Sequence, residues 1–79
     1  MNRRNVLSVY LAEAEAQVER SNLLVINQRN KVLQLTREQR DTTSAAVVLG
    51  YLERMLAQHV AERERLTDEL AELGPRRIA

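Results

Sequence analysis

Apolar residues recur along this chain at alternating intervals of three and four positions, in two long stretches. The first stretch runs from Leu7 to Gln39 and the second from Ala45 to Leu73. These spacings place side chains on one face of an α-helix, and their strict alternation is the heptad pattern of coiled coils. We call this face of each helix the seam. Its members are Leu7, Leu11, Ala14, Val18, Ser21, Val25, Gln28, Val32, Leu35, Gln39, Ala45, Leu49, Leu52, Leu56, His59, Arg63, Leu66, Leu70 and Leu73.

The residues that separate and follow these stretches predict two helices. From residue 5 to residue 73 there is no proline and a single glycine, Gly50, and strong helix formers dominate. Asp41-Thr42-Thr43-Ser44 is a run of N-cap residues, so we expect Asp41 or Thr42 to cap a second helix. Gly74-Pro75 favours a helix end. We predict one domain, 1–79, with helix 5–39, turn 40–43, helix 43–73 and tail 74–79.

A chain reversal near Asp41 would bring the two seams together as an all-α, antiparallel, coiled-coil-like hairpin. A single alignment of the two helices then pairs seam residues along the full length of the hairpin. It pairs Leu35 with Leu49, Val18 with Leu66 and Leu11 with Leu73. The alternative is one long bent helix in a parallel coiled coil.

Four polar residues interrupt the apolar seam. The predicted alignment places His59 opposite Val25 and Arg63 opposite Ser21, so the middle of the hairpin is expected to be polar. Polar seam residues cost stability but fix register and oligomeric state. A ligand-binding or pH-responsive role for His59 is the alternative to this structural one. The polar seam consists of Ser21, Gln28, His59 and Arg63.

Several large apolar residues lie off the seam, where an isolated hairpin leaves them in water. A 79-residue chain without cysteine has a small core and no disulfide to support it. We therefore predict that two copies form a homodimeric four-helix bundle, with a helix of another protein as a further candidate partner. Gly50 belongs to a stripe of small side chains with Ala46, Ala57 and Ala61. The predicted interface comprises Leu23, Leu24, Ile26, Leu33, Val47, Val48, Gly50 and Met55.

Charge and hydropathy favour a soluble, cytoplasmic protein. Lysine and arginine number 12 against 11 acidic residues, and no apolar run approaches the length of a membrane span. The hairpin would gather Arg3 and Arg4 beside Arg76 and Arg77 as a basic patch at its open end. A small nucleic-acid-associated or regulatory protein is thus the alternative function, although no base-stacking aromatic residues are interleaved.

The sequence carries no motif that predicts catalysis. A di-metal carboxylate bundle needs Glu-x-x-His, but position 56, three before the sole histidine, is Leu56. Ser21 and His59 would form a pair without a third member or an oxyanion donor. We expect no enzyme activity, no metal and no cofactor.

Parts of the chain resemble a group of short, uncharacterised helical-hairpin proteins of α-proteobacteria. The resemblance spans residues 10–70 and implies a bacterial origin and the hairpin fold, without a mechanism. At the turn, Gln39-Arg40 stands where the group usually has Gly-His. The matching motifs are Leu11-Ala12-x-Ala14-Glu15, Gln28-Arg29, Asp41-Thr42 and His59-x-x-x-Arg63-x-x-Leu66.

Overall fold

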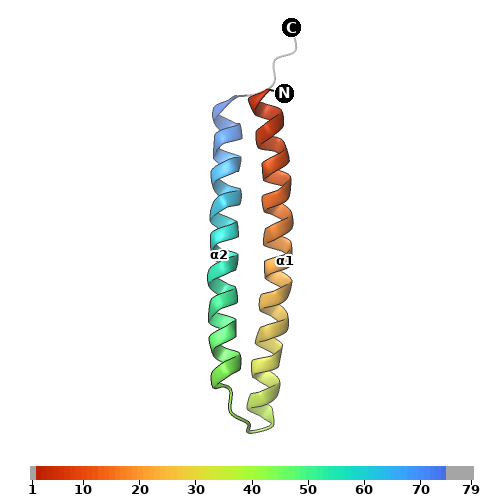
Figure 1. The fold of residues 1–79 in the computed structure, drawn as a ribbon, viewed down its shortest axis with the longest axis vertical. Coiled ribbons are helices and arrows are strands. Elements are labelled where there is room, and N and C mark those ends of the chain that lie inside the picture. The colour runs from red at the N-terminus through yellow and green to blue at the C-terminus, as the bar shows by residue number, and fades with distance from the viewer. Residues whose placement is uncertain (1, 75–79) are drawn as a thin grey trace.

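The computed structural model describes residues 2–74, which form two long α-helices joined by one turn (Figure 1). α1 spans Arg3–Arg37 and α2 spans Thr43–Glu72. The helices lie side by side and antiparallel in a rod with extents of 66 × 18 × 15 Å. We call the end that holds both ends of the described chain the open end, and the opposite end the turn end. The predicted all-α hairpin is confirmed, and a single continuous helix is excluded.

Local capping sets where α1 begins. The side chain of Asn2 accepts a hydrogen bond from the backbone N–H of Asn5 at 2.8 Å, which satisfies one of the free donors at the start of the helix. α1 therefore begins at Arg3, two residues before the predicted start. It also ends two residues before the predicted end, at Arg37.

Burial follows the predicted seam. All seam positions from Leu7 to Leu35 and from Ala45 to Leu70 are buried or half-buried, and only Gln39 and Leu73 are exposed. Both helices are amphipathic along this line, so each turns its apolar stripe toward the other. The buried residues are Leu7, Ala14, Ser21, Val25, Ala45 and Leu66.

The alignment of the two seams differs from the predicted one. Leu66, which is 2% exposed, forms a cluster with Leu7 and Ala14, and Leu11 and Leu70 pack against it. Leu7 and Ala14 are about 10 Å apart along α1, so Leu66 lies between them, at the level of Leu11. The predicted pairing of Leu66 with Val18 is wrong by one heptad.

Two polar contacts agree with this alignment. Arg3 pairs with Glu69 at 3.2 Å, and the side-chain amide of Gln28 donates to the carbonyl of Ala45 at 3.0 Å. The predicted alignment would carry Arg3 beyond the end of α2. The observed one brings Leu7 to the level of Leu70 and lets both helices finish together at the open end.

The turn begins with a Schellman motif. The N–H of Arg40 donates to the carbonyl of Leu35 at 2.9 Å and the N–H of Gln39 donates to the carbonyl of Thr36 at 3.0 Å. This motif requires a left-handed residue, and Gln39 supplies it with φ of 56°. Glycine is the usual residue at such a position because it has no Cβ.

Asp41 caps the start of α2, as expected from the sequence. Its carboxylate accepts hydrogen bonds from the backbone N–H of Thr43 at 2.9 Å and from the Thr43 hydroxyl at 2.7 Å. Thr42 precedes the helix directly but forms no side-chain cap. Asp41 is therefore the one of the two candidates that caps α2.

Replacing Gln39 by glycine is expected to stabilise the hairpin. The left-handed conformation costs a residue with Cβ about 1–2 kcal/mol, which glycine avoids. Glycine also loses more chain entropy on folding, so we expect a net gain of roughly 0.5–1 kcal/mol in the free energy of unfolding. Urea denaturation at one fixed protein concentration measures this gain.

The control is Gln17→Gly, at an exposed position in the middle of α1. It should lower the free energy of unfolding by about 1 kcal/mol, because helix-interior glycine is unfavourable. A loss of stability in both variants would contradict the role given to Gln39.

Candidate interaction surface

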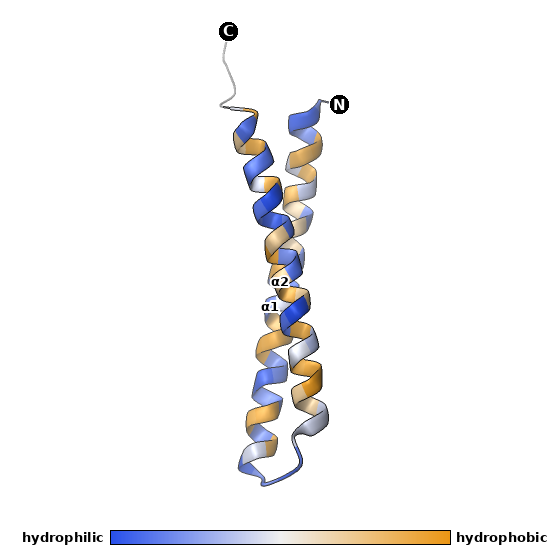
Figure 2. Cartoon of the chain, turned by 90° about the vertical axis from the view of Figure 1, so that its left-hand side faces the viewer, coloured by the Kyte–Doolittle hydropathy of each residue, from blue (hydrophilic) through white to orange (hydrophobic). Residues whose placement is uncertain are grey.

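The structure leaves the large off-seam apolar side chains in solvent. Most of them come from residues 23–33 of α1 and residues 47–55 of α2, segments linked by the Arg29–Glu53 ion pair, whereas Val9, Tyr10 and Leu73 are exposed near the open end. These segments lie next to the turn, and Figure 2 shows more hydrophobic colour on α2 near the turn than near the open end. Of the predicted interface, Gly50 and Met55 are half-buried. The exposed members are Leu23, Leu24, Ile26, Leu33, Val47 and Val48.

Tyr51 also belongs to this surface, although the apolar pattern of the sequence did not mark it. Tyr51 lies in the same part of α2, and 57% of it is exposed. Its position four residues after Val47, on a neighbouring part of the helix surface, was the available signal. Tyr51 adds a large amphipathic ring of a kind that is frequent in protein interfaces.

A groove runs along one face of the middle of the hairpin, from the Arg29–Glu53 pair toward Glu64. It has a volume of about 450 Å³, and its floor is apolar. At its rim stand Arg29 and Glu53, whose ion pair is about half exposed and so adds little stability. The apolar lining is Val25, Leu56, Ala57, Val60 and Ala61.

The polar seam residues all lie along the contact between the helices. Ser21 is buried, whereas Gln28, His59 and Arg63 are half-buried. The side-chain amide of Gln28 donates to the carbonyl of Ala45 at 3.0 Å. Gln28 therefore ties α1 to the first turn of α2.

The polar residues do not face one another as predicted. The one-heptad shift brings His59 to the level of Val18 and Arg63 to that of Ala14, so Arg63 is no longer opposite Ser21. His59 lines an open hollow of about 460 Å³ with Ala14 and Gln17. Other side chains in this hollow are Tyr10, Glu13, Glu62, Arg65 and Leu66.

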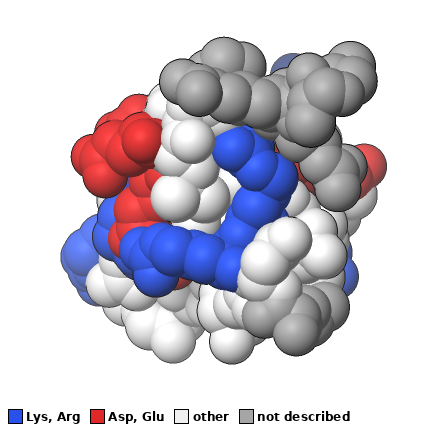
Figure 3. Space-filling model, turned by 90° about the horizontal axis from the view of Figure 1, so that it is seen from above, with Lys and Arg blue, Asp and Glu red and all other residues white. Residues whose placement is uncertain are grey.

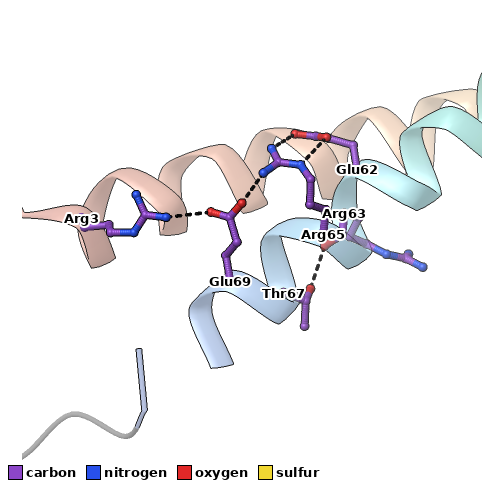
Figure 4. A network of polar contacts seen from close by, with 6 residues as sticks. All are labelled: Arg3, Glu62, Arg63, Arg65, Thr67 and Glu69. Atoms are coloured by element: carbon purple, nitrogen blue, oxygen red, sulfur yellow. Dashed lines mark hydrogen bonds and ion pairs between the residues drawn. The ribbon is translucent and has the colours of Figure 1, made fainter. Parts of the chain in front are cut away.

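A chain of ion pairs joins this hollow to the open end (Figure 4). Arg65 donates to Glu62 at 2.5 Å and also pairs with Glu69, which in turn accepts from Arg3 at 3.2 Å. The hydrogen bond from Arg65 holds the pKa of Glu62 below its ordinary value, and the same contact raises the pKa of Arg65. The charged pair in the hollow is thus a salt bridge.

Within the described residues, the arginines of the predicted basic patch donate hydrogen bonds to other groups of the same chain. Arg4 donates to the carbonyls of Gly74 at 2.6 Å and Leu73 at 3.4 Å. These carbonyls end α2, where a cation is favourable for the helix dipole. Figure 3 looks onto this end, where basic side chains lie beside acidic ones. Arg76 and Arg77 lie outside the described residues.

Two further features concern ligands and membranes. Within residues 2–74, no group of three or more His, Cys, Asp or Glu side chains is placed to hold a metal ion. Neither α1 nor α2 has a stretch both long and apolar enough to traverse a bilayer.

Comparison with protein-family models, with curated protein sequences and with solved structures finds no match to this chain. The resemblance to α-proteobacterial hairpin proteins therefore stays a prediction. Fold and surface define an all-helical hairpin with an exposed apolar region next to its turn.

Replacing Arg4 by methionine is expected to cost about 1 kcal/mol in the free energy of unfolding, because the last carbonyls of α2 lose a charged hydrogen-bond donor. The matched control is Arg3→Met, which removes only the exposed ion pair to Glu69 and should cost less than about 0.5 kcal/mol. Chemical denaturation of both variants compares these losses. Equal losses of stability in the two variants would contradict the capping role of Arg4.

Asp41 should make stability depend on pH at the acid end. Hydrogen bonds from the Thr43 hydroxyl, and then from the Thr43 N–H, lower the pKa of Asp41 from its ordinary value of 3.8. A carboxyl whose folded pKa is depressed contributes stability that is present above the unfolded value and lost as pH falls through the folded one. Asp41→Asn should therefore make the melting temperature depend less on pH below about pH 4.

Thr43→Val is the matched variant, because it keeps the Asp41 carboxylate and removes the hydroxyl donor. NMR titration should then find the pKa of Asp41 closer to 3.8 than in the wild type. An unchanged value in Thr43→Val would contradict the assigned cause.

Proposed function

We propose that this chain is a non-enzymatic self-association module of the cytoplasm, in which two hairpins form a homodimeric four-helix bundle. The observation that carries the proposal is the gathering of exposed large apolar side chains next to the turn. Large apolar side chains that a small protein leaves in water are candidates for an interface. Leu24 and Leu33 of α1, with Val47 and Val48 of α2, are among these side chains.

The amount of exposed surface also supports association. The chain has an accessible surface of 6245 Å². A compact monomer of 9.1 kDa is expected to expose roughly 4,900 Å². A rod of two helices exposes more of its surface than a compact globule of the same mass does. A second hairpin would therefore have ample surface to cover.

The small core gives a second argument. Among the described residues, the buried apolar ones are Leu7, Ala14, Val25, Ala45 and Leu66, and two of these five are alanines. Helices gain most of their stability from packing of an apolar face. Two hairpins that share a core bury more of that face than one hairpin does.

The proposal predicts that thermal stability depends on protein concentration. Unfolding of a dimer also dissociates it, so a tenfold rise in concentration should raise the melting temperature by about 3–6 °C. Circular dichroism at several concentrations, with sedimentation equilibrium for the mass, measures both effects. Superimposable melts and a particle of 9.1 kDa would refute self-association.

Variants separate a specific interface from nonspecific sticking. Leu24→Gln combined with Leu33→Gln should abolish the concentration dependence and leave a helical monomer. Asn27→Gln combined with Asn30→Gln changes exposed polar positions of the same segment and should leave the dimer intact. Equal behaviour of the two double variants would count against the proposal.

A further inference from the structure

The exposed apolar side chains next to the turn lie on two faces of the hairpin, one on each side of the seam. Val48 of α2 lines a hollow together with Lys31 of α1, so both lie on the same side. Leu24 stands seven residues before Lys31 and Met55 seven residues after Val48, and a heptad returns a side chain to the same face. Tyr51 lies between Val48 and Met55 on α2. We call Leu24, Val48, Tyr51 and Met55 the tyrosine face.

The opposite face carries the Arg29–Glu53 ion pair. Ile26 and Leu33 lie beside Arg29 on α1, three residues before it and four residues after it. Covering this face would take a charged pair out of water, which costs free energy. The tyrosine face instead has apolar side chains directly beside the seam, and helices that face the core of a bundle carry such a widened apolar stripe. The tyrosine face is therefore the better suited of the two to be covered by further helices.

The two helices present the tyrosine face at the same level of the rod. Leu66 packs between Leu7 and Ala14 and so lies level with Leu11. By the same alignment Leu24 lies at a level between Tyr51 and Met55. A two-fold axis parallel to the helices keeps every residue at its level and sets α1 of one copy against α2 of the other.

This axis places a large side chain over a hole of matching spacing. In coiled coils a side chain of one helix enters a hole formed by four residues of the facing helix. Val48, Tyr51, Leu52 and Met55 have the spacing of such a hole, because they stand at positions i, i+3, i+4 and i+7. Leu24 of a second copy would enter it, and the first copy's Leu24 would enter the equivalent hole of the second.

The charges on this side of the hairpin are of opposite sign on the two helices. The side chains concerned stand at multiples of seven residues from Leu24 and Glu13 on α1, and from Val48 and Tyr51 on α2. Three basic residues and one acidic residue give α1 a net charge of +2 here, and one basic and three acidic residues give α2 a net charge of −2. These residues are Arg3, Glu13, Arg20 and Lys31 of α1, with Glu62, Arg65, Glu69 and Glu72 of α2.

These facing charges favour the parallel axis over one that runs across the helices. The parallel axis sets the positive surface of α1 on the negative surface of α2, and it does so twice in the dimer. An axis across the helices would set α1 on α1 with reversed levels. Because Lys31 and Arg20 lie on either side of Leu24 along α1, Lys31 of each copy would then meet Arg20 of the other, and like charges repel.

We propose that the tyrosine face is the contact surface for the same face of a second copy, an inference that rests on the proposed self-association. The two-fold axis runs parallel to the helices, so both turns lie at the same end. α1 of each copy packs on α2 of the other, and Leu24 fills the hole beside Tyr51. The face with Arg29 and Glu53 stays in solvent.

Two single substitutions decide between the faces. Leu24→Gln should raise the dissociation constant of the dimer about tenfold or more, because it places a polar side chain in an apolar hole. Leu33→Gln makes the same chemical change on the opposite face, where the leucine is 47% exposed against 50% for Leu24, and should leave the dissociation constant unaltered. Sedimentation equilibrium measures both constants, and circular dichroism checks that both variants remain helical.

Cross-linking tests the axis, because the chain has no cysteine of its own. A Leu24→Cys chain is mixed with a Tyr51→Cys chain and treated with a short bifunctional maleimide. We expect a cross-linked heterodimer and little product from either chain alone. The control mixes Ile26→Cys with Gly50→Cys, which lie on the side of the Arg29–Glu53 pair, and should give little product.

The outcomes distinguish the inference from the proposed function. A monomeric wild type overturns both. A dimeric wild type in which Leu24→Gln is silent, or in which Leu33→Gln weakens the dimer equally, overturns the tyrosine face and leaves self-association standing. Cross-linking of Leu24→Cys only to itself would show α1 stacked on α1 and would overturn the axis.

Discussion

The packing of Leu66 between Leu7 and Ala14 is the contact on which the rest of the hairpin depends. It sets the level of α2 along α1, and every other pairing follows from that level. Arg3 meets Glu69, Gln28 meets the carbonyl of Ala45 and Arg4 reaches the end of α2 because of it. Both helices also finish together, so no apolar turn of α1 projects beyond α2.

Periodicity could predict the hairpin but could not choose between alignments one heptad apart. Each such alignment keeps the seam of one helix against the seam of the other, because a shift of seven residues preserves the heptad pattern. The predicted one adds a layer of Gln39 with Ala45, whereas the observed one adds a layer of Leu7 with Leu70. The predicted alignment would also have paired Leu11 with Leu73, which is exposed in the observed one, so the burial of leucines at the ends does not choose between them.

For a related reason, the sequence did not show where α1 ends and the turn begins. Asp41 marked the start of α2 correctly, because its carboxylate is a recognisable cap. The end of α1 has no such mark, because the left-handed residue is Gln39 and not the glycine that usually signals it. The reversal therefore begins closer to Arg37 than the cluster of N-cap residues indicated.

The candidate surface was easier to anticipate than the polar contacts. A large apolar residue off the seam stays exposed in any alignment, so the exposure of Leu23, Leu24 and Ile26 did not depend on register. The contacts of Arg4 and His59 did depend on it, since a shift of seven residues replaces every neighbour across the seam. Sequence patterns thus predict best what register leaves unchanged.

The surface of the hairpin differs between its two ends, and this difference bears on how two copies could pack together. Near the open end, Arg3, Glu62, Arg65 and Glu69 satisfy one another's charges on the surface. Near the turn, the surface presents leucine, isoleucine and valine. Burying the surface near the turn removes apolar area from water, whereas burying the surface near the open end would desolvate ion pairs that are already well solvated. The proposed dimer therefore has to bring the turn-end halves of the two hairpins together.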